Sequence, residues 1–134
     1  MEYKCVPQIG GKWKFRAVNL TRYKDTVPAF SNIKEVNLIL EVEQQDRFVI
    51  VKMPSHETRP VDGYRIGVWS KEPNGDWKLI LADDDDNGQS VVSVKECKHG
   101  KPCVLTGYYI ESGYSSENPQ QRPTVDYQLW KRIN

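Results

Sequence analysis

The stretch EVNLILEVE, from Glu35 to Glu43, alternates apolar and polar side chains. Successive side chains of an extended chain point to opposite faces, so a period of two is typical of a strand with one face in a core and the other in water. The stretch therefore predicts a β-strand with an aliphatic inner face. That face carries Val36, Leu38, Leu40 and Val42.

The same alternation recurs along the chain and predicts about eight strands. Residues 12–20 place Trp13, Phe15 and Ala17 on the inner side. The dipeptide Asn74-Gly75 is typical of a hairpin turn. The predicted inner sides of its two strands carry Tyr64, Ile66, Val68, Trp77, Leu79 and Leu81. Further strands are predicted at Arg47 to Met53, Ser90 to Glu96, Val104 to Glu111 and Thr124 to Ile133.

Two tryptophans fall on the strand faces opposite to the ones that we assign to the interior. In the last strand we assign Val125, Tyr127 and Leu129 to the inner side, which leaves Trp130 on the outer side. Trp69 is predicted to point outward for the same reason. Exposed aromatic side chains beside arginine are typical of interface anchors.

Long loop-type stretches alternate with tight turns. The long stretches are Arg22 to Ile33, which has room for one helical turn, Pro54 to Asp62, Asp83 to Gln89 and Gly113 to Pro123. The tight turns are Gln44 to Asp46, Pro73 to Asp76 and Lys98 to Pro102. If the strands run up and down in order, every long loop lies at one end. We therefore predict an all-β fold, an eight-stranded antiparallel up-and-down β-barrel with long loops at one end, as a single domain over residues 1–134.

Two other all-β folds fit the sequence less well. A trefoil would show an internal repeat, and an immunoglobulin-type sandwich usually has a cysteine, tryptophan, cysteine spacing across its core. The sequence has neither. Closure into a barrel also removes exposed edge strands and makes the first and last strands neighbours.

Charge and composition exclude several classes of partner. The formal net charge is +1, which gives no reason to expect nucleic acid. No apolar run approaches the roughly 20 residues that span a bilayer, so we expect no membrane span. A secreted, processed chain and a cytoplasmic one both stay open, as do a monomer and a dimer.

The cysteines suggest a disulfide. Cys97 and Cys103 flank a predicted hairpin turn at a spacing that brings two strand ends within disulfide reach. Metal binding is the alternative, but His99 is the one nearby imidazole and three or four ligands are needed. Cys5 makes the count odd and competes for either partner, stays free or links two chains. We expect an intrachain disulfide between Cys97 and Cys103, and no metal site.

The acidic run Asp83 to Gly88 contains the first half of a calcium loop, Asp-x-Asp-x-Asn-Gly. The twelfth position of such a loop should be glutamate, and it is Val94 here. A solvated turn is therefore the simpler interpretation. Carboxylates gathered at a barrel mouth would also attract a cationic ligand or a basic protein surface.

Gly11-Lys12-Trp13 resembles the glycine, any residue, tryptophan motif of the first strand of lipocalins and the wider calycin group, which includes fatty-acid-binding proteins and avidins. The resemblance implies that Trp13 lies at a closed floor, crossed by a basic residue of the last strand. Lys131 and Arg132 are the candidates. It also implies a barrel that binds something, and the compact length is similar to that of an avidin.

Two functions follow. The first is a non-enzymatic carrier that binds, and in that sense transports, a small hydrophobic or amphipathic ligand, cationic if the acidic run contributes, at its open end. Its predicted ligand-binding residues are Phe15, Ala17, Leu38, Leu40, Ile66, Val68, Leu79 and Tyr108. We expect no catalysis, because no phosphate loop or nucleophile motif is present, and we also expect no cofactor.

The second function is an interaction module or inhibitor that recognises a partner protein through its long mouth loops. It follows from the bulky inner side chains, which fill much of an eight-stranded barrel. Its predicted contacts are Tyr23, Phe30, His56, Arg59, Asp84, Asp85, Tyr114 and Arg122. Phe30 separates the two functions, because it points into the barrel as a lid or outward as a docking residue.

Overall fold

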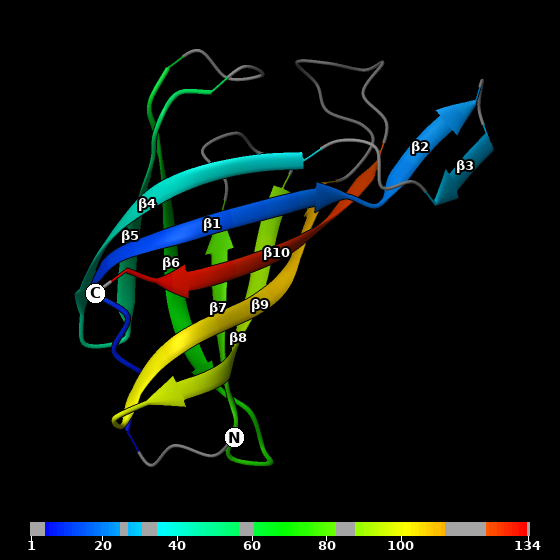
Figure 1. Cartoon of the computed structure of the whole chain (residues 1–134). Coiled ribbons are helices and arrows are strands. Elements are labelled where there is room, and N and C mark those ends of the chain that lie inside the picture. The colour runs from blue at the N-terminus through cyan, green and yellow to red at the C-terminus, as the bar shows by residue number, and fades with distance from the viewer. Residues whose placement is uncertain are drawn as a thin grey trace.

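The computed structural model describes residues 5–24, 27–30, 35–56, 61–82, 88–111 and 123–133, and the side chains of 22–24 and 27–28 lie outside the described part. All regular structure in these ranges is β (Figure 1). Eight strands form a closed antiparallel barrel in the order β1-β10-β9-β8-β7-β6-β5-β4. They are β1 (Gly11–Asn19), β4 (Glu35–Gln45), β5 (Phe48–Met53), β6 (Gly63–Lys71), β7 (Trp77–Ala82), β8 (Gly88–Lys98), β9 (Lys101–Glu111) and β10 (Thr124–Arg132). The predicted fold class is confirmed.

The barrel closes through its first strand. β1 pairs with β4 from Gly11↔Val42 to Val18↔Glu35, and with β10 from Trp13↔Arg132 to Asn19↔Asp126. Each other barrel strand pairs with its neighbour in sequence, so the barrel runs up and down. Its backbone donors and acceptors therefore have partners around the whole circumference, and no edge is left open.

A two-stranded ribbon extends from the mouth where the sequence leaves room for a helical turn. β2 (Thr21–Lys24) pairs with β3 (Val27–Phe30), and the ribbon projects from the barrel in Figure 1. Its base is attached to β10, because the Leu20 amide donates to the Val125 carbonyl at 2.8 Å. This stretch is therefore extended, as Pro28 in its middle favours.

The tight turns lie together at the end of the barrel opposite the ribbon, which we call the floor (Figure 1). Asp46 in the β4–β5 turn and His99 in the β8–β9 turn adopt left-handed backbone angles, φ 55° and 54°. Gly75 in the β6–β7 turn has a positive φ, and so does Gly100, which follows His99 in the β8–β9 turn. The longer connections join the opposite strand ends, which form the mouth. The predicted asymmetry of the loops therefore describes the barrel correctly.

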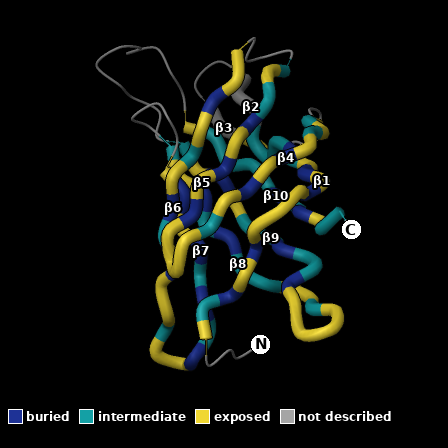
Figure 2. The backbone as a smooth tube through the Cα atoms, turned by 90° about the vertical axis from the view of Figure 1, so that its left-hand side faces the viewer, coloured by how far each residue is buried: buried dark blue, intermediate teal, exposed yellow. Residues whose placement is uncertain are grey.

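Side chains alternate between the barrel interior and the solvent, as the buried and exposed segments of Figure 2 show. The predicted inner faces of β1, β4 and β7 are confirmed: Trp13, Leu40 and Leu79 have no exposed surface. Those of β6, β9 and β10 are wrong. Ile66, Val68 and Tyr108 point outward, and the inner faces carry Trp69, Tyr109 and Trp130 instead.

The physical reason for these errors is that apolar residues occupy both faces of these strands. On β6 the inner set includes Gly67, where a Cβ would collide with the side chain of Leu81. The inner set is therefore the less apolar one, while Ile66 on the outer set is 63% exposed. Trp69 and Trp130, predicted to be outward anchors, are core residues.

Candidate functional site

The floor of the barrel is built around Trp13. Its indole donates from Nε1 to the Ile9 carbonyl at 2.8 Å, and its ring meets Trp130 edge to face at 6.3 Å between centroids. The guanidinium of Arg132 lies 4.6 Å from the centroid of the Trp13 ring. Gly11, with φ 126°, starts the strand where a Cβ would come within 3.4 Å of Arg132. The geometry thus selects Arg132 as the basic residue that crosses Trp13.

Arg132 also fastens the segment that precedes β1. Its guanidinium donates to three carbonyl oxygens, those of Pro102, Gly10 and Gln8, at 2.7–2.8 Å. Partial burial lowers the pKa of Arg132, and the neighbouring Cys103 offsets that shift in part. Lys131 is one position out of phase and is exposed. Of the two predicted floor residues, only Arg132 crosses Trp13.

The lower interior is packed. Trp13, Trp69 and Trp130 are at most 1% exposed, and aliphatic side chains fill the space between them. Leu40 and Leu79, predicted to contact ligand, have no exposed surface and belong to this core. They are absent from the lining of the mouth cavity. Their position therefore makes them packing residues.

A layer of buried polar groups lies above the core. Gln128, 1% exposed, donates from Nε2 to Ser90 Oγ at 2.8 Å and accepts from Trp130 Nε1 at 3.1 Å. Arg65 Nη1 lies 3.4 Å from the same Ser90 Oγ. Buried polar groups are stable where they bond to one another. This layer separates the packed core from the space at the mouth.

That space is a cavity of about 250 Å³ at the loop-bearing end. Three residues of the predicted ligand set, Phe15, Ala17 and Leu38, line it. The predicted mouth residue His56 lines it as well. The rest of the lining consists of Asn19, Val36, Met53, Arg65, Tyr109, Asp126 and Gln128.

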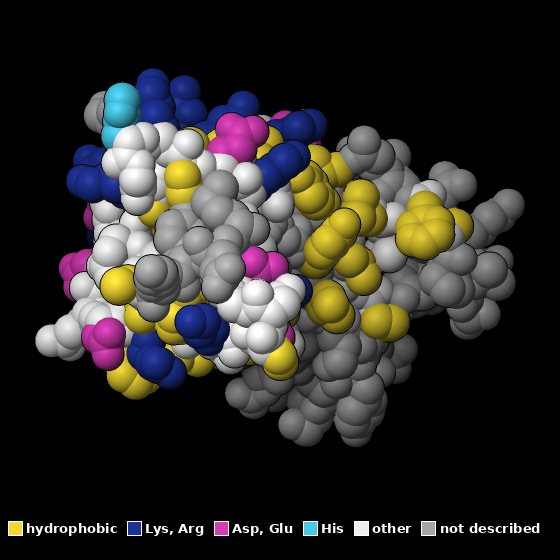
Figure 3. All heavy atoms as spheres, turned by 90° about the horizontal axis from the view of Figure 1, so that it is seen from below, with side chains coloured by type: hydrophobic (Ala, Val, Ile, Leu, Met, Phe, Trp, Pro, Cys, Tyr) yellow, Lys and Arg dark blue, Asp and Glu magenta, His cyan; other side chains and the backbone are white. Residues whose placement is uncertain are grey.

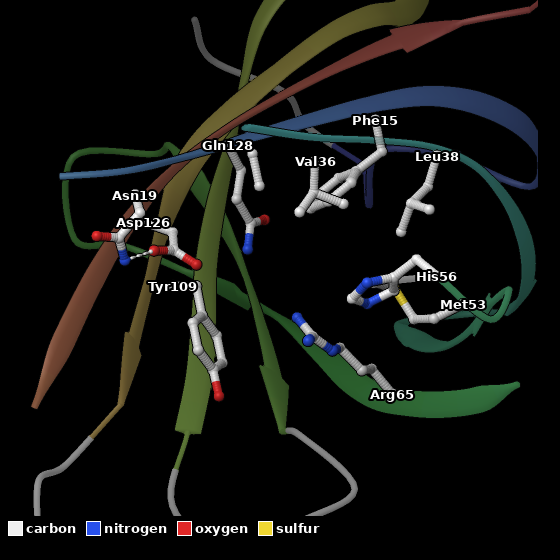
Figure 4. A pocket seen from close by; sticks show the side chains of 11 residues that line it. Phe15, Asn19, Val36, Leu38, Met53, His56, Arg65, Tyr109, Asp126 and Gln128 are labelled. Atoms are coloured by element: carbon white, nitrogen blue, oxygen red, sulfur yellow. Dashed lines mark hydrogen bonds between the residues drawn. The ribbon is translucent and has the colours of Figure 1, made fainter. Parts of the chain in front are cut away.

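The cavity has walls of different chemistry (Figure 4). Phe15, Val36 and Leu38, from β1 and β4, form an apolar wall, and the guanidinium of Arg65 points into the space from β6. The same guanidinium lies over the Tyr109 ring, with its central carbon 5.0 Å from the ring centroid. At another edge, Asp126 accepts a 2.6 Å hydrogen bond from Asn19 Nδ2.

The interactions at the edge hold two acidic groups in place. Tyr109 donates its hydroxyl to Glu111 at 2.8 Å, and Asn19 holds Asp126 as described above. The cavity lining includes one arginine, Arg65, and one carboxylate, Asp126, which Asn19 holds at the edge. An apolar surface with a few oriented polar groups is typical of a small-molecule site.

Several polar lining residues were missed in the sequence. Gln128 and Asp126 share a face of β10 with Trp130, and Arg65 shares one of β6 with Trp69. Assigning the tryptophans inward would have brought these polar side chains inward with them. The two tryptophans were therefore the signal in the sequence that could have found these residues. The prediction instead placed the more apolar face of each strand inward.

Most predicted mouth contacts lie outside the described residues. These are Arg59, Asp84, Asp85, Tyr114 and Arg122, together with the side chain of Tyr23 on β2. Phe30, at the end of β3, is described and is 90% exposed. It points outward, which is the orientation expected of a docking residue.

The predicted disulfide is not formed. The β8–β9 register places Cys97 opposite Pro102 and Glu96 opposite Val104, so Cys103 falls at the irregularity between those pairs. The two cysteines are therefore not directly opposite each other, and no bond joins them. Burial raises the pKa of the Cys97 thiol, and the nearby Cys103 raises it further. A thiol held in its protonated form is a poor nucleophile.

Two further findings concern the described ranges only. Within them no three His, Cys, Asp or Glu side chains are grouped to hold a metal ion. No helix among these residues has the length and apolar character needed to cross a membrane.

Comparison with known proteins leaves the family open. No protein-family model matches the chain, and no curated protein or solved structure matches it either. The closed eight-stranded antiparallel barrel is compatible with a calycin-like fold. Membership in that group stays a prediction, supported by Gly11-Lys12-Trp13 and by Arg132 over the tryptophan ring.

Proposed function

We propose that this chain is a non-enzymatic binding protein that takes a small amphipathic acid into the cavity at its mouth. The observation that carries the proposal is the pairing of an apolar wall with one inward guanidinium, Arg65, around about 250 Å³. Ligand pockets for drug-sized molecules are roughly 300–1,000 Å³, so the ligand is smaller than these. An alkyl or aromatic body fits against Phe15 and Leu38.

Arg65 supports an acidic head group. A guanidinium binds carboxylate and phosphate through several parallel donors. Gln128 and Ser90 lie at the base of the cavity, where Arg65 Nη1 approaches Ser90 Oγ. A head group seated there would keep its charge next to polar groups while its body covers apolar surface. The acidic run at 83–86, which suggested a cationic ligand, lies outside the described residues.

The test compares three probes with the same chain, octanoate, octylamine and octanol, by titration calorimetry. We expect octanoate to bind best. Substitution Arg65→Met should weaken octanoate binding by about tenfold or more, since a hydrogen bond to a charged group contributes about 1.5–3 kcal/mol. Lys52→Met is the matched control, because it removes one cation from the outward face of β5 next to Met53.

A second variant tests the cavity itself. Ala17 lines the space, so Ala17→Leu should fill part of it and weaken all three probes alike. Circular dichroism confirms that each variant is folded. Tighter binding of octylamine than of octanoate would contradict the proposal that the ligand is an acid. A folded wild type that binds none of the three probes would count against the binding function itself.

Docking of a partner protein is the second candidate, and the orientation of Phe30 favours it. A phenyl ring that is 90% exposed on the ribbon, at the end of β3 that pairs with Thr21, is available to a partner. Capture of proteins from a source extract by wild type, Phe30→Ser and Ile39→Ser would test it. We expect Phe30→Ser alone to lose a partner; equal capture by all three would remove the ribbon from any interface.

A further inference from the structure

The outer face of the barrel is apolar around β6. Phe48 and Ile50 on β5, Tyr64 and Ile66 on β6, and Ile80 on β7 each leave 38–63% of their surface exposed. We call these five residues the β6 facet. Seen from the floor end, hydrophobic side chains reach the surface at several places around the flank (Figure 3). Exposed apolar patches of this kind mark interaction sites in soluble proteins.

The side chains of the β6 facet are contiguous. Ile50 lies directly opposite Ile66 across the β5–β6 ladder. Val68, between them and the floor, lies opposite both Phe48 and Ile80. Directly opposed residues have Cβ atoms about 4.5–5.5 Å apart, close enough for their side chains to touch. The facet is therefore one surface that crosses three strands.

The charges are at the border of the facet. On β6, which is described throughout, the outward positions are Tyr64, Ile66, Val68 and Ser70, and none is charged. On the β4 side, Glu43 lies opposite Ile50 and Glu41 opposite Lys52. On the other side, Lys78 of β7 lies opposite Ser70. An apolar centre with a charged rim of both signs is the usual anatomy of a protein interface.

The area fits a dimer. Aromatic and large aliphatic side chains exposed to this extent present on the order of 100 Å² each, so the facet offers about 500 Å² of apolar surface. A standard interface covers about 800 Å² per partner. The apolar share of a homodimer interface is about 65%, which also amounts to about 500 Å².

We propose that the chain forms a twofold dimer in which the β6 facet of one copy packs on the β6 facet of a second. A twofold interface uses the same patch on both copies and so needs only one apolar surface. With the axis along β6, the acidic β4 edge of one copy faces the β7 edge, with Lys78, of the other. The net charge of +1 leaves little repulsion between copies. The acidic edge also disfavours an anionic lipid surface as the occupant.

Sedimentation equilibrium tests the dimer with the full chain. We expect wild type to dimerise with a dissociation constant at or below about 10 μM, and Ile66→Lys to weaken the dimer by about tenfold or more. The control is Ile110→Lys, an equally apolar outward position on β9 that is 50% exposed and lies away from the facet. It should leave the dimer unchanged.

Three results would overturn the proposal. They are a wild type that stays monomeric at about 200 μM, disruption by Ile110→Lys but not by Ile66→Lys, and a monomer that co-sediments with phosphatidylcholine vesicles, which would assign the face to lipid. If Ile66→Lys does not fold by circular dichroism, Tyr64→Glu replaces it. Tyr64 is 54% exposed and lies within the same facet.

Discussion

The two halves of the barrel interior are built from the same strands but have opposite characters. Toward the floor, three fully buried tryptophans and aliphatic side chains form the core. Toward the mouth, the same β1 and β4 present Phe15 and Leu38 to a cavity. The layer of Gln128 and Ser90 marks the change. A core confined to the floor leaves the mouth end of the same strands to line a cavity with polar groups.

Two leucines on β4 test the difference between floor and mouth most directly. Leu40 is fully buried at the floor, and Leu38 lines the cavity. Leu40→Ala should lower the free energy of unfolding by about 2–5 kcal/mol, because it leaves a void among packed neighbours. Leu38→Ala should cost less than half as much, because its neighbours already border open space. Guanidinium unfolding measures both. Equal losses would mean that the two halves are packed alike.

The next largest effect is expected at the floor from Arg132. Arg132→Ala removes three hydrogen bonds to carbonyls and the contact with the Trp13 ring. We expect a loss of about 2–3 kcal/mol in unfolding free energy. Lys131→Ala, one residue away and exposed, should stay within about 0.5 kcal/mol of wild type. A larger loss of unfolding free energy in Lys131→Ala than in Arg132→Ala would contradict the stabilising role given to Arg132.

The polar layer gives a smaller effect. Gln128→Leu leaves Trp130 Nε1 and Ser90 Oγ without this partner, so we expect a loss of about 1–2 kcal/mol in thermal or chemical unfolding. Gln89→Leu, on the outward face of β8, is the control and should change stability little. If Gln128→Leu instead stabilises the fold, the layer serves the cavity at the expense of stability.

The smallest effect is expected on the outer face of the barrel, at a contact between β1 and β4. Arg16 Nε donates to Glu35 Oε1 at 2.6 Å, and this contact lowers the pKa of the Glu35 carboxyl. Because the folded pKa is lower, the stabilisation is present above the unfolded carboxyl pKa and is lost as pH falls through the folded one. Arg16→Met should therefore change the melting temperature slightly near neutral pH and not at all in strong acid or high salt. A large effect that salt does not reduce would show that the pair is not a solvated surface contact.

The sequence predicted the barrel because period-two alternation and the placement of long loops are local patterns. It also predicted the inner faces of β1 and β4, where polar residues occupy the outer face, and so found Phe15, Ala17 and Leu38. It failed on β6, β9 and β10, whose outer faces are as apolar as their inner ones. On these strands alternation alone cannot show which face points into the barrel, because the register with neighbouring strands decides it.

The same ambiguity hid the polar part of the candidate site. Arg65 and Gln128 share their strand faces with Trp69 and Trp130, which were assigned outward, so neither residue entered the predicted site. The disulfide prediction failed for a related reason, since sequence spacing does not reveal the register irregularity that separates Cys97 from Cys103.

The position of β1 between β4 and β10 also has a consequence for how the chain folds. Trp13 meets Trp130 and Arg132 only after every other strand of the barrel has been made, because β1 is its first strand and β10 its last. Until β10 is available, β1 and β9 each present an unpaired edge on which another chain can add. Closure depends on contacts far apart in sequence, which makes folding slow. During synthesis the protein is therefore exposed to misassociation until its last strand inserts, and conditions that speed this final step should raise the yield of folded barrel.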